Sequence, residues 1–184
     1  MPETTLAYQP SESELATVFD LKYRRDPELG WGPRTRLRFG YFNPDDHYEA
    51  IVARLVTAGI DWADVGCGRD IFPSNPRLAD QLSKRCSSLF GIDPDPNIRD
   101  NPYISDGFEG MLEDCVTDRR FDLITLRMVA EHITNPPRVV AKLSELTKPG
   151  GRVVVYTPNK WAPVSLLAAA VPNHLHHRFK RVVW

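Results

Sequence analysis

From residue 60 onward, short apolar runs alternate with stretches of helical periodicity, and this alternation constrains the fold more than any other feature. The centres of the runs lack a polar alternate face, as expected for strands that are covered on both sides. The runs occupy residues 62–65, 89–92, 103–105, 121–126 and 152–156. Helices are predicted between them at residues 78–86 and 137–147. The pattern predicts an α/β fold with a doubly wound, mostly parallel sheet of about five strands.

The N-terminal region has a different pattern, which predicts a helical extension. Apolar spacing predicts one helix over residues 11–25 and another over 44–59, the second opening on Pro44. Residues 26–43 are rich in Gly, Pro and Arg, so a loop is expected there. The expected organisation is a helical cap and loop at 1–59, a core at 60–160, and an apolar, basic lid or association segment at 161–184.

Charge and cysteine content limit the possible classes of protein. The 184 residues carry a formal net charge of −1, so no overall field favours nucleic acid or an acidic membrane. The three cysteines form no close pair, which predicts neither a disulfide framework nor a zinc site and suits a reducing cytoplasm. The N-terminus lacks the basic start and apolar stretch of a signal peptide. We therefore expect a cytoplasmic protein.

The first and second apolar runs both end in residues that suit a nucleotide-type ligand. Asp64 lies near the end of the first run, and Gly66, Cys67 and Gly68 follow it. Glycine is needed where backbone must approach a ligand without an intervening Cβ. Asp93 ends the second run, where a carboxylate can bind both hydroxyls of a ribose. A plain strand–turn–helix with turn glycines is the alternative interpretation.

The residues after the glycine turn distinguish between two kinds of ligand. A dinucleotide fingerprint requires glycine at position 71, which is Ile71 in this chain. The carboxylate of Asp70 would repel a pyrophosphate. A cationic cofactor without phosphates suits the turn better, and S-adenosylmethionine (SAM) is such a cofactor.

Four segments, in order along the chain, resemble the motifs of class I SAM-dependent methyltransferases of the ubiquinone-pathway type. Residues 64–68 resemble motif I, and residues 91–93 resemble the motif II acid that binds ribose. Residues 121–132 and 148–156 resemble the motifs of the fourth and fifth strands. The resemblance implies a Rossmann-like fold and SAM as cofactor.

The resemblance also implies individual roles. Asp106, Gly107 and Phe108 would follow the third strand and contact adenine, while Arg127 and Met128 would line the methionine end of the cofactor. The full set of expected cofactor residues is Asp64, Gly66, Cys67, Gly68, Asp93, Asp106, Gly107, Phe108, Arg127 and Met128. Two departures stand out: Asp70 replaces the usual third glycine, and the proline-rich link at 93–102 leaves room only for a turn or vestigial helix.

The best candidate for a general base is His132, with Glu131 beside it, just after the fourth run. An imidazole has an ordinary pKa of about 6.5, which suits proton removal near neutrality. Capping or packing of a short helix is the alternative role for His132. Glu131 and His132 also resemble part of a Glu-x-x-Glu-His metal motif, but Met128 stands at the first Glu position, so no metal is expected.

Two further segments could contact a partner. Residues 21–41 interleave basic and aromatic side chains, which suits a clamp on the cofactor or an anionic substrate; RNA binding is the less favoured alternative. Residues 159–184 are basic and apolar, which suits a helix over the pocket or one at a membrane interface. This segment includes His174, His176 and His177, which could supply a base but are more typical of a solvated basic stretch.

The combined evidence predicts a methyltransferase for a small-molecule or glycan-type acceptor, with oxygen favoured over nitrogen. The alternatives are an RNA or protein methyltransferase and a non-catalytic SAM-binding scaffold. A complete class I sheet continues beyond the fifth strand, so the last visible strand should leave an edge at which copies of the chain could associate.

Overall fold

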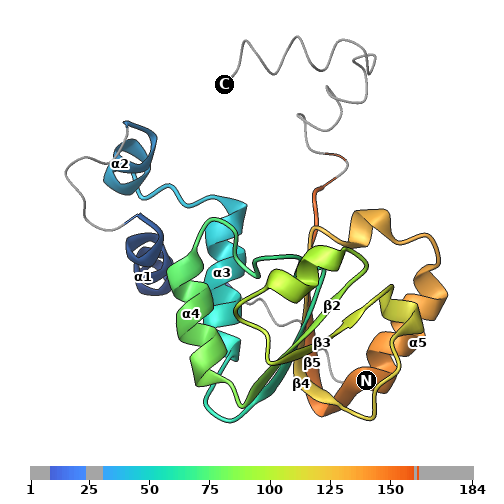
Figure 1. The fold of residues 1–184 in the computed structure, drawn as a ribbon. Helices are drawn as coiled ribbons and strands as arrows, with labels where there is room; N and C mark the ends of the chain where they lie inside the picture. Colours follow the sequence, from blue (N-terminus) through green and yellow to red (C-terminus); the bar gives the residue numbers. More distant parts are fainter. Residues whose placement is uncertain (1–8, 24–30, 160, 162–184) are drawn as a thin grey trace.

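The fold is a single parallel sheet between two layers of helices, seen in a computed structural model that describes residues 9–23, 31–159 and 161 (Figure 1). The strands are β1 Asp61–Val65, β2 Ser88–Asp93, β3 Asp106–Glu109, β4 Phe121–Arg127 and β5 Thr147–Tyr156. They lie in the order β3-β2-β1-β4-β5, and every pairing is parallel. The chain therefore reverses its direction of travel across the sheet between β1 and β4, where ligands bind in doubly wound folds. The predicted α/β class is confirmed.

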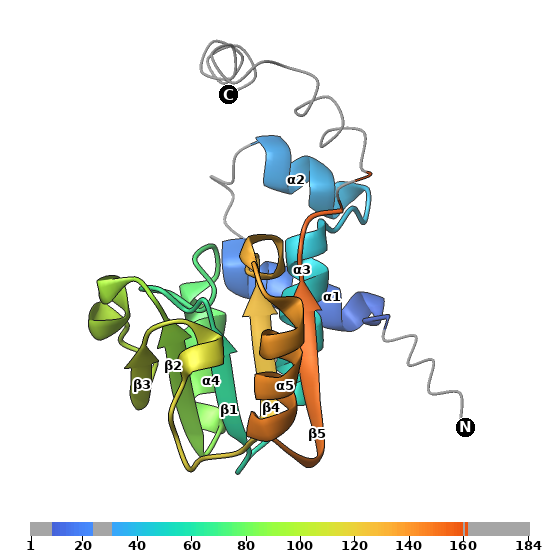
Figure 2. The same cartoon turned by 90° about the vertical axis from the view of Figure 1, so that its right-hand side faces the viewer.

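Helices cover both faces of the sheet. α1 (Glu12–Tyr23), α3 (Pro44–Leu55) and α4 (Pro76–Arg85) lie on one face, and α5 (Pro136–Leu146) lies on the other (Figures 1 and 2). Successive strand residues point to opposite faces, so Trp62 joins the first hydrophobic cluster and Ala63 the second. Because α1 and α3 share their cluster with the sheet, the N-terminal helices are part of the same core.

The same two-residue signal starts three of the helices. Asn43, Asn75 and Asn135 are the N-caps of α3, α4 and α5, and a proline follows each of them. The asparagine side chain accepts a hydrogen bond from a backbone N–H of the first turn, which has no partner within the helix. Proline fits the next position because an N–H there would have no helical partner, so its absence loses no hydrogen bond.

A buried group of charges joins the N-terminal helices to one another. The ammonium of Lys22 on α1 lies 3.0 Å from Asp46 and 2.8 Å from Glu49, both on α3. Arg36, on α2, also pairs with Asp46. The amide of Asn75 donates to Glu49 at 2.8 Å, so the cap of α4 belongs to the same network. These contacts fix α1, α2, α3 and the start of α4 relative to one another.

Two predictions from the sequence are wrong. The expected loop at 26–43 contains a helix, α2 (Trp31–Arg38), which lies beyond the carboxyl ends of the strands (Figure 2). Pro33 is compatible with it because proline is tolerated in the first turn of a helix. The third strand is not at 103–105 but at Asp106–Glu109, where pairing with β2 overrides the poor strand propensity of Asp and Gly.

The link after β2 matches the expectation of a vestigial helix, because it contains only a short 3-10 helix, η1 (Pro96–Asp100). Two more short 3-10 helices follow β3 and β4, namely η2 (Leu112–Asp114) and η3 (Ala130–His132). Among the described residues, no helix is both long and apolar enough to cross a bilayer.

Candidate functional site

The turn after β1 requires its two glycines. Gly66 has a φ of +76° and Gly68 a φ of +43°, in the left-handed region that favours glycine. A Cβ on Gly66 would lie 2.3 Å from Cγ2 of Val129, in the loop after β4. The turn also bonds to the next strand, since the Gly66 N–H donates to the carbonyl of Ile92 at 2.8 Å. The backbone of β1 is thereby held against the carboxyl ends of both neighbouring strands.

Asp93, at the end of β2, is fixed by backbone donors. The N–H of Gly68 donates to its Oδ2 at 2.7 Å, and the N–H of Asp95 donates to its Oδ1 at 2.7 Å. Each carboxylate oxygen can accept more than one hydrogen bond, so both retain capacity for a ligand. This is the arrangement needed to hold two adjacent hydroxyls.

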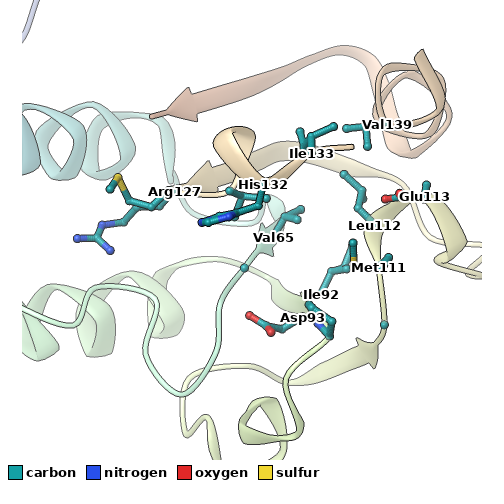
Figure 3. Close-up of a pocket in the computed structure, with 15 residues that line it drawn as sticks. Val65, Ile92, Asp93, Met111, Leu112, Glu113, Arg127, His132, Ile133 and Val139 are labelled. Carbon is teal, nitrogen blue, oxygen red and sulfur yellow. The ribbon is translucent and has the colours of Figure 1, made fainter. Parts of the chain in front are cut away.

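A cavity of about 330 Å³ lies at the carboxyl ends of β1, β2 and β4, with Asp93 on one side and His132 on the other (Figure 3). Its apolar lining includes Ile92, Met111, Leu112, Val129, Ile133 and Val139. Met111, Leu112, Ile133 and Val139 gather at the end away from Arg127 (Figure 3). The surroundings at that end suit a flat apolar ring, and Asp93 lies on one side of the same cavity.

The residues predicted to contact adenine do not line this cavity. Asp106, Gly107 and Phe108 belong to β3 itself, because the strand starts later than expected. Asp106 is exposed and lies 3.7 Å from Arg119, while Phe108 packs against the second hydrophobic cluster. Their place is taken by residues 110–113, which follow β3 and line the cavity.

A second cavity of about 270 Å³ extends the first toward the glycine turn. It is lined by Asp64, Asp70 and Arg127, and it shares Gly66 and Arg127 with the first cavity. The two cavities therefore lie next to each other at the carboxyl edge of the sheet, and we call the pair the cofactor cleft. Its ends differ in character, because one is apolar and the other carries charged groups.

The polar end of the cleft contains the buried carboxyl group of Asp64. Asp64 is 3% exposed, and its Oδ1 accepts a hydrogen bond from the hydroxyl of Thr125 at 2.5 Å. Burial raises the pKa of this carboxyl to about 7, against the opposing effects of the Thr125 hydrogen bond and the Arg127 charge. Arg127 itself is held by Asp45 of α3, with Nη2 at 2.9 Å from Oδ1.

Cys67 contributes to the turn through its backbone. Its side chain is buried, and burial raises the pKa of its thiol to about 12, so the sulfur is neutral at physiological pH. Asn101, which the sequence analysis missed, donates its amide to the carbonyls of Cys67 and Gly68 at 3.3 and 3.0 Å. No local motif marks Asn101; only the folding of the link after β2 brings it to the turn.

The two predicted catalytic residues have different surroundings. His132 lines the cofactor cleft together with Arg127 and Met128. Glu131 is exposed, accepts a hydrogen bond from the Thr157 hydroxyl at 2.9 Å and does not line the described cleft. Both side chains are exposed, but only His132 lines the described cleft, whereas Glu131 links η3 to the residue after β5.

Two of the basic side chains in the segment 21–41 form ion pairs inside the fold. Lys22 and Arg36 are used in the ion pairs with α3, so they do not form an open basic surface. Arg34 and Arg38 are exposed, while Arg24 and Arg25 lie outside the described residues. Residues 162–184, with the predicted lid and histidine cluster, are also outside the described residues.

Comparisons with known proteins show the family of the chain. Residues 38–182 match the family model of a methyltransferase domain. A ubiquinone biosynthesis O-methyltransferase from Methylococcus capsulatus is 27% identical over 155 residues, covering 79% of this chain and 63% of that protein. The chain thus spans less than two thirds of the length of this relative. Since the family match covers most of the chain, the chain belongs to the class I SAM-dependent methyltransferases.

Solved structures share the fold. An amino pentose methyltransferase from Micromonospora echinaspora, solved with SAM bound, has a TM-score of 0.51 at 18% identity and covers 76% of this chain and 61% of its own. A TehB-like SAM-dependent methyltransferase from Corynebacterium glutamicum has a TM-score of 0.50 at 21% identity, covering 74% of this chain and 76% of its own. At these identities the likeness concerns the fold alone.

The described residues fit SAM, the cofactor of this family. An adenine ring matches the apolar end of the cleft, and ribose hydroxyls match the two oxygens of Asp93. The buried carboxyl of Asp64, which has no ion pair among the described side chains, matches an ammonium group. Within the described residues, no group of three His, Cys, Asp or Glu side chains is arranged to hold a metal ion.

Proposed function

We propose that this chain binds SAM in the cofactor cleft and transfers its methyl group to a small-molecule or glycan-type acceptor, at oxygen rather than nitrogen. The observation that carries the proposal is the order of chemistries along one cleft. An apolar end is followed by the doubly held carboxylate of Asp93 and then by Asp64 and Arg127. Adenine, ribose and an amino-acid end occur in this order in SAM.

Each group has a defined task in this proposal. Asp93 accepts hydrogen bonds from the two ribose hydroxyls, and Asp64 receives the ammonium group. Arg127 turns from Asp45 toward the carboxylate, since a guanidinium pairs with carboxylates bidentately. When bound, SAM supplies an electrophilic methyl group on its sulfonium. The protein then has to align the acceptor and, for an oxygen acceptor, remove a proton.

The preference for oxygen is supported by two observations. His132 lines the cleft, as Arg127 does, and from there it can take a proton from a hydroxyl (Figure 3). The curated relative from Methylococcus capsulatus is named as an O-methyltransferase. Nucleic acid is not proposed as a partner, because Lys22 and Arg36 are used within the fold. Association of copies through the edge of β5, membrane contact through 161–184, and a cytoplasmic location stay predictions.

The first test is calorimetric titration of the wild-type chain with SAM and with its demethylated product, S-adenosylhomocysteine (SAH). We expect saturable one-to-one binding with a dissociation constant on the order of micromolar, as is common for cofactors. A panel of simple phenols, sugars and amines is then offered with labelled SAM. A folded chain that binds neither SAM nor SAH would overturn the proposal, and transfer to amines alone would overturn the preference for oxygen.

Replacing His132 by alanine should lower the turnover rate with a hydroxyl acceptor by about 100-fold, because general base catalysis contributes on that scale. SAM affinity should stay within about 3-fold of wild type, since the expected loss concerns proton removal. The measurement is kcat and the SAM dissociation constant on the same preparation. Glu131→Ala is the matched control, because its carboxylate contacts Thr157 instead of the cleft. Equal losses in both variants would contradict a base role for His132.

A further inference from the structure

Three buried side chains at the polar end of the cofactor cleft, Trp62, Thr125 and Asp64, are joined by hydrogen bonds. We call this group the relay, and the sequence motifs do not describe it. Thr125 and Trp62 are fully buried, and Asp64 is almost so. A buried carboxylate needs hydrogen-bond donors, or it becomes neutral by taking up a proton. The guanidinium of Arg127 pairs with Asp45, so it does not fill this need directly.

The register of two neighbouring strands brings the relay together. Asp64 on β1 pairs with Thr125 on β4, so their side chains point to the same face of the sheet. Trp62 precedes Asp64 by two residues and therefore lies on that face as well. Its indole Nε1–H donates to the Thr125 hydroxyl at 2.8 Å.

The hydroxyl of Thr125 has one proton and two candidate acceptors. Asp64 Oδ1 lies at 2.5 Å and the carbonyl oxygen of Ala63 at 3.3 Å. The shorter, charge-assisted bond to the carboxylate is the stronger of the two. Trp62 donates to the Thr125 oxygen, and an ionised Asp64 can only accept, so the one proton of the Thr125 hydroxyl is donated to Asp64. Oδ1 of Asp64 is thus held by Thr125. The other carboxylate oxygen remains available to a ligand in the cavity that Asp64 lines.

We infer that Thr125 is a positioning residue for the cofactor's amino-acid end: its hydroxyl, held by Trp62, orients the Asp64 carboxylate so that its free oxygen receives the ammonium group. This inference rests on the proposed function. Thr125 does not touch the cofactor; it acts through Asp64.

A tyrosine of α3 packs beside Asp64 and Thr125. Tyr48 of α3 is buried, and among the described residues its hydroxyl has no hydrogen-bond partner. Its ring is held by stacking on Tyr156 at 5.2 Å and by an edge contact with Phe72. Asp64 and Thr125 are among the groups that perturb this hydroxyl. Tyr48 thus packs beside Asp64 and Thr125 but lines a separate cavity between α3 and β5, not the cofactor cleft.

The relay also affects the ionisation of Asp64, which must be negative to receive an ammonium group. Burial raises its pKa to about 7, and the Thr125 hydrogen bond opposes that rise. Arg127 also lowers the pKa, whereas Asp93 raises it; Tyr48 faces the same carboxyl from α3. SAM and SAH affinity should therefore rise as the pH increases through the pKa of Asp64. Loss of the Thr125 donor should move that midpoint to higher pH.

The test compares Thr125→Val, which keeps the shape and removes the hydroxyl, with Thr125→Ser, which keeps the hydroxyl. Titration with SAH from about pH 6 to about pH 9 should show affinity at least about 10-fold weaker in the valine variant at neutral pH. Its affinity midpoint should lie at higher pH than in wild type. The serine variant should stay within about 3-fold of wild type, with an unchanged midpoint.

5′-Methylthioadenosine is the control ligand, because it lacks the amino-acid end. Its affinity should be the same in wild type and in Thr125→Val. Equal weakening of SAH and methylthioadenosine would mean a general distortion of the cleft and would overturn the inference. Wild-type SAH affinity in Thr125→Val, with an unchanged pH midpoint, would overturn it as well.

Carboxyl NMR titration of Asp64 in the cofactor-free chain separates this inference from the proposed function. A higher Asp64 pKa in Thr125→Val than in wild type supports the relay even if no SAH binds, whereas an unchanged pKa contradicts it. If the valine variant does not fold, Trp62→Phe replaces it. That change removes the donor behind Thr125 together with part of a buried ring, so its unfolding free energy is measured alongside; it should shift the Asp64 midpoint in the same direction by a smaller amount.

Discussion

Replacing Asp93 by alanine is expected to weaken SAM and SAH binding by at least about 100-fold. Two hydrogen bonds from ribose hydroxyls to a carboxylate contribute about 1.5–3 kcal/mol each, and each 1.4 kcal/mol is a factor of ten in affinity. The substitution also removes the acceptor for the N–H groups of Gly68 and Asp95, so the glycine turn loses its anchor. Calorimetry with SAH measures the loss directly.

Asp106→Ala is the matched control for Asp93→Ala. Asp106 was expected from the sequence to contact adenine, yet it is exposed on β3 and faces Arg119. Its replacement should leave SAH affinity within about 2-fold of wild type, since exposed ion pairs contribute little. If Asp106→Ala impaired binding as strongly as Asp93→Ala, the cleft would be misassigned. Wild-type affinity in Asp93→Ala would exclude the ribose role.

Replacing Lys22 by methionine is expected to lower the free energy of unfolding by about 3–5 kcal/mol, the cost of breaking a buried ion pair on one side only. The ammonium of Lys22 lies against the buried carboxylates of Asp46 and Glu49. Burial lowers the pKa of Lys22, but its hydrogen bonds to Glu49 and Asp46 outweigh this and hold the pKa above its usual value. The lysine is therefore charged, and its removal leaves negative charge uncompensated. Urea unfolding measures the change.

Lys84→Met is the control for Lys22→Met. Lys84 forms an exposed pair with Asp80 on the surface of α4, and its side chain is 72% exposed. Surface pairs of this kind contribute about 0–1 kcal/mol, so stability should barely change. Similar unfolding free energies for Lys22→Met and wild type would show that the charges between α1 and α3 do not support the fold. Weaker SAH binding is expected in Lys22→Met, because Asp45 and Arg127 depend on the position of α3.

The sequence could predict the parts of the site that are formed by one strand and the turn after it. Asp64 lies near the end of the first apolar run, Gly66 and Gly68 follow that run, and Asp93 ends the second. Their positions follow from strand geometry and from the need for glycine at a left-handed turn. Asparagine followed by proline likewise starts three helices through local hydrogen bonds alone.

The apolar end of the cleft, where we propose that adenine binds, could not be placed in the same way. Local propensity places the third strand at 103–105, where Tyr and Ile occur, whereas pairing with β2 creates it at Asp106–Glu109. Propensity is a weak guide for a short edge strand, because its neighbour supplies the hydrogen bonds. As a result, residues 110–113 line the cleft in place of Asp106, Gly107 and Phe108.

The sequence by itself determined the fold class, the order of the strands along the chain, the glycine turn and the two acids at its sides. These features arise from periodicity and turn chemistry within a few residues. Only the tertiary structure decided that Thr125 holds Asp64, that Asn101 clamps the turn and that Asp45 pairs with Arg127. Each of these contacts joins segments far apart in the chain, so it depends on strand register and helix packing, which no local pattern encodes.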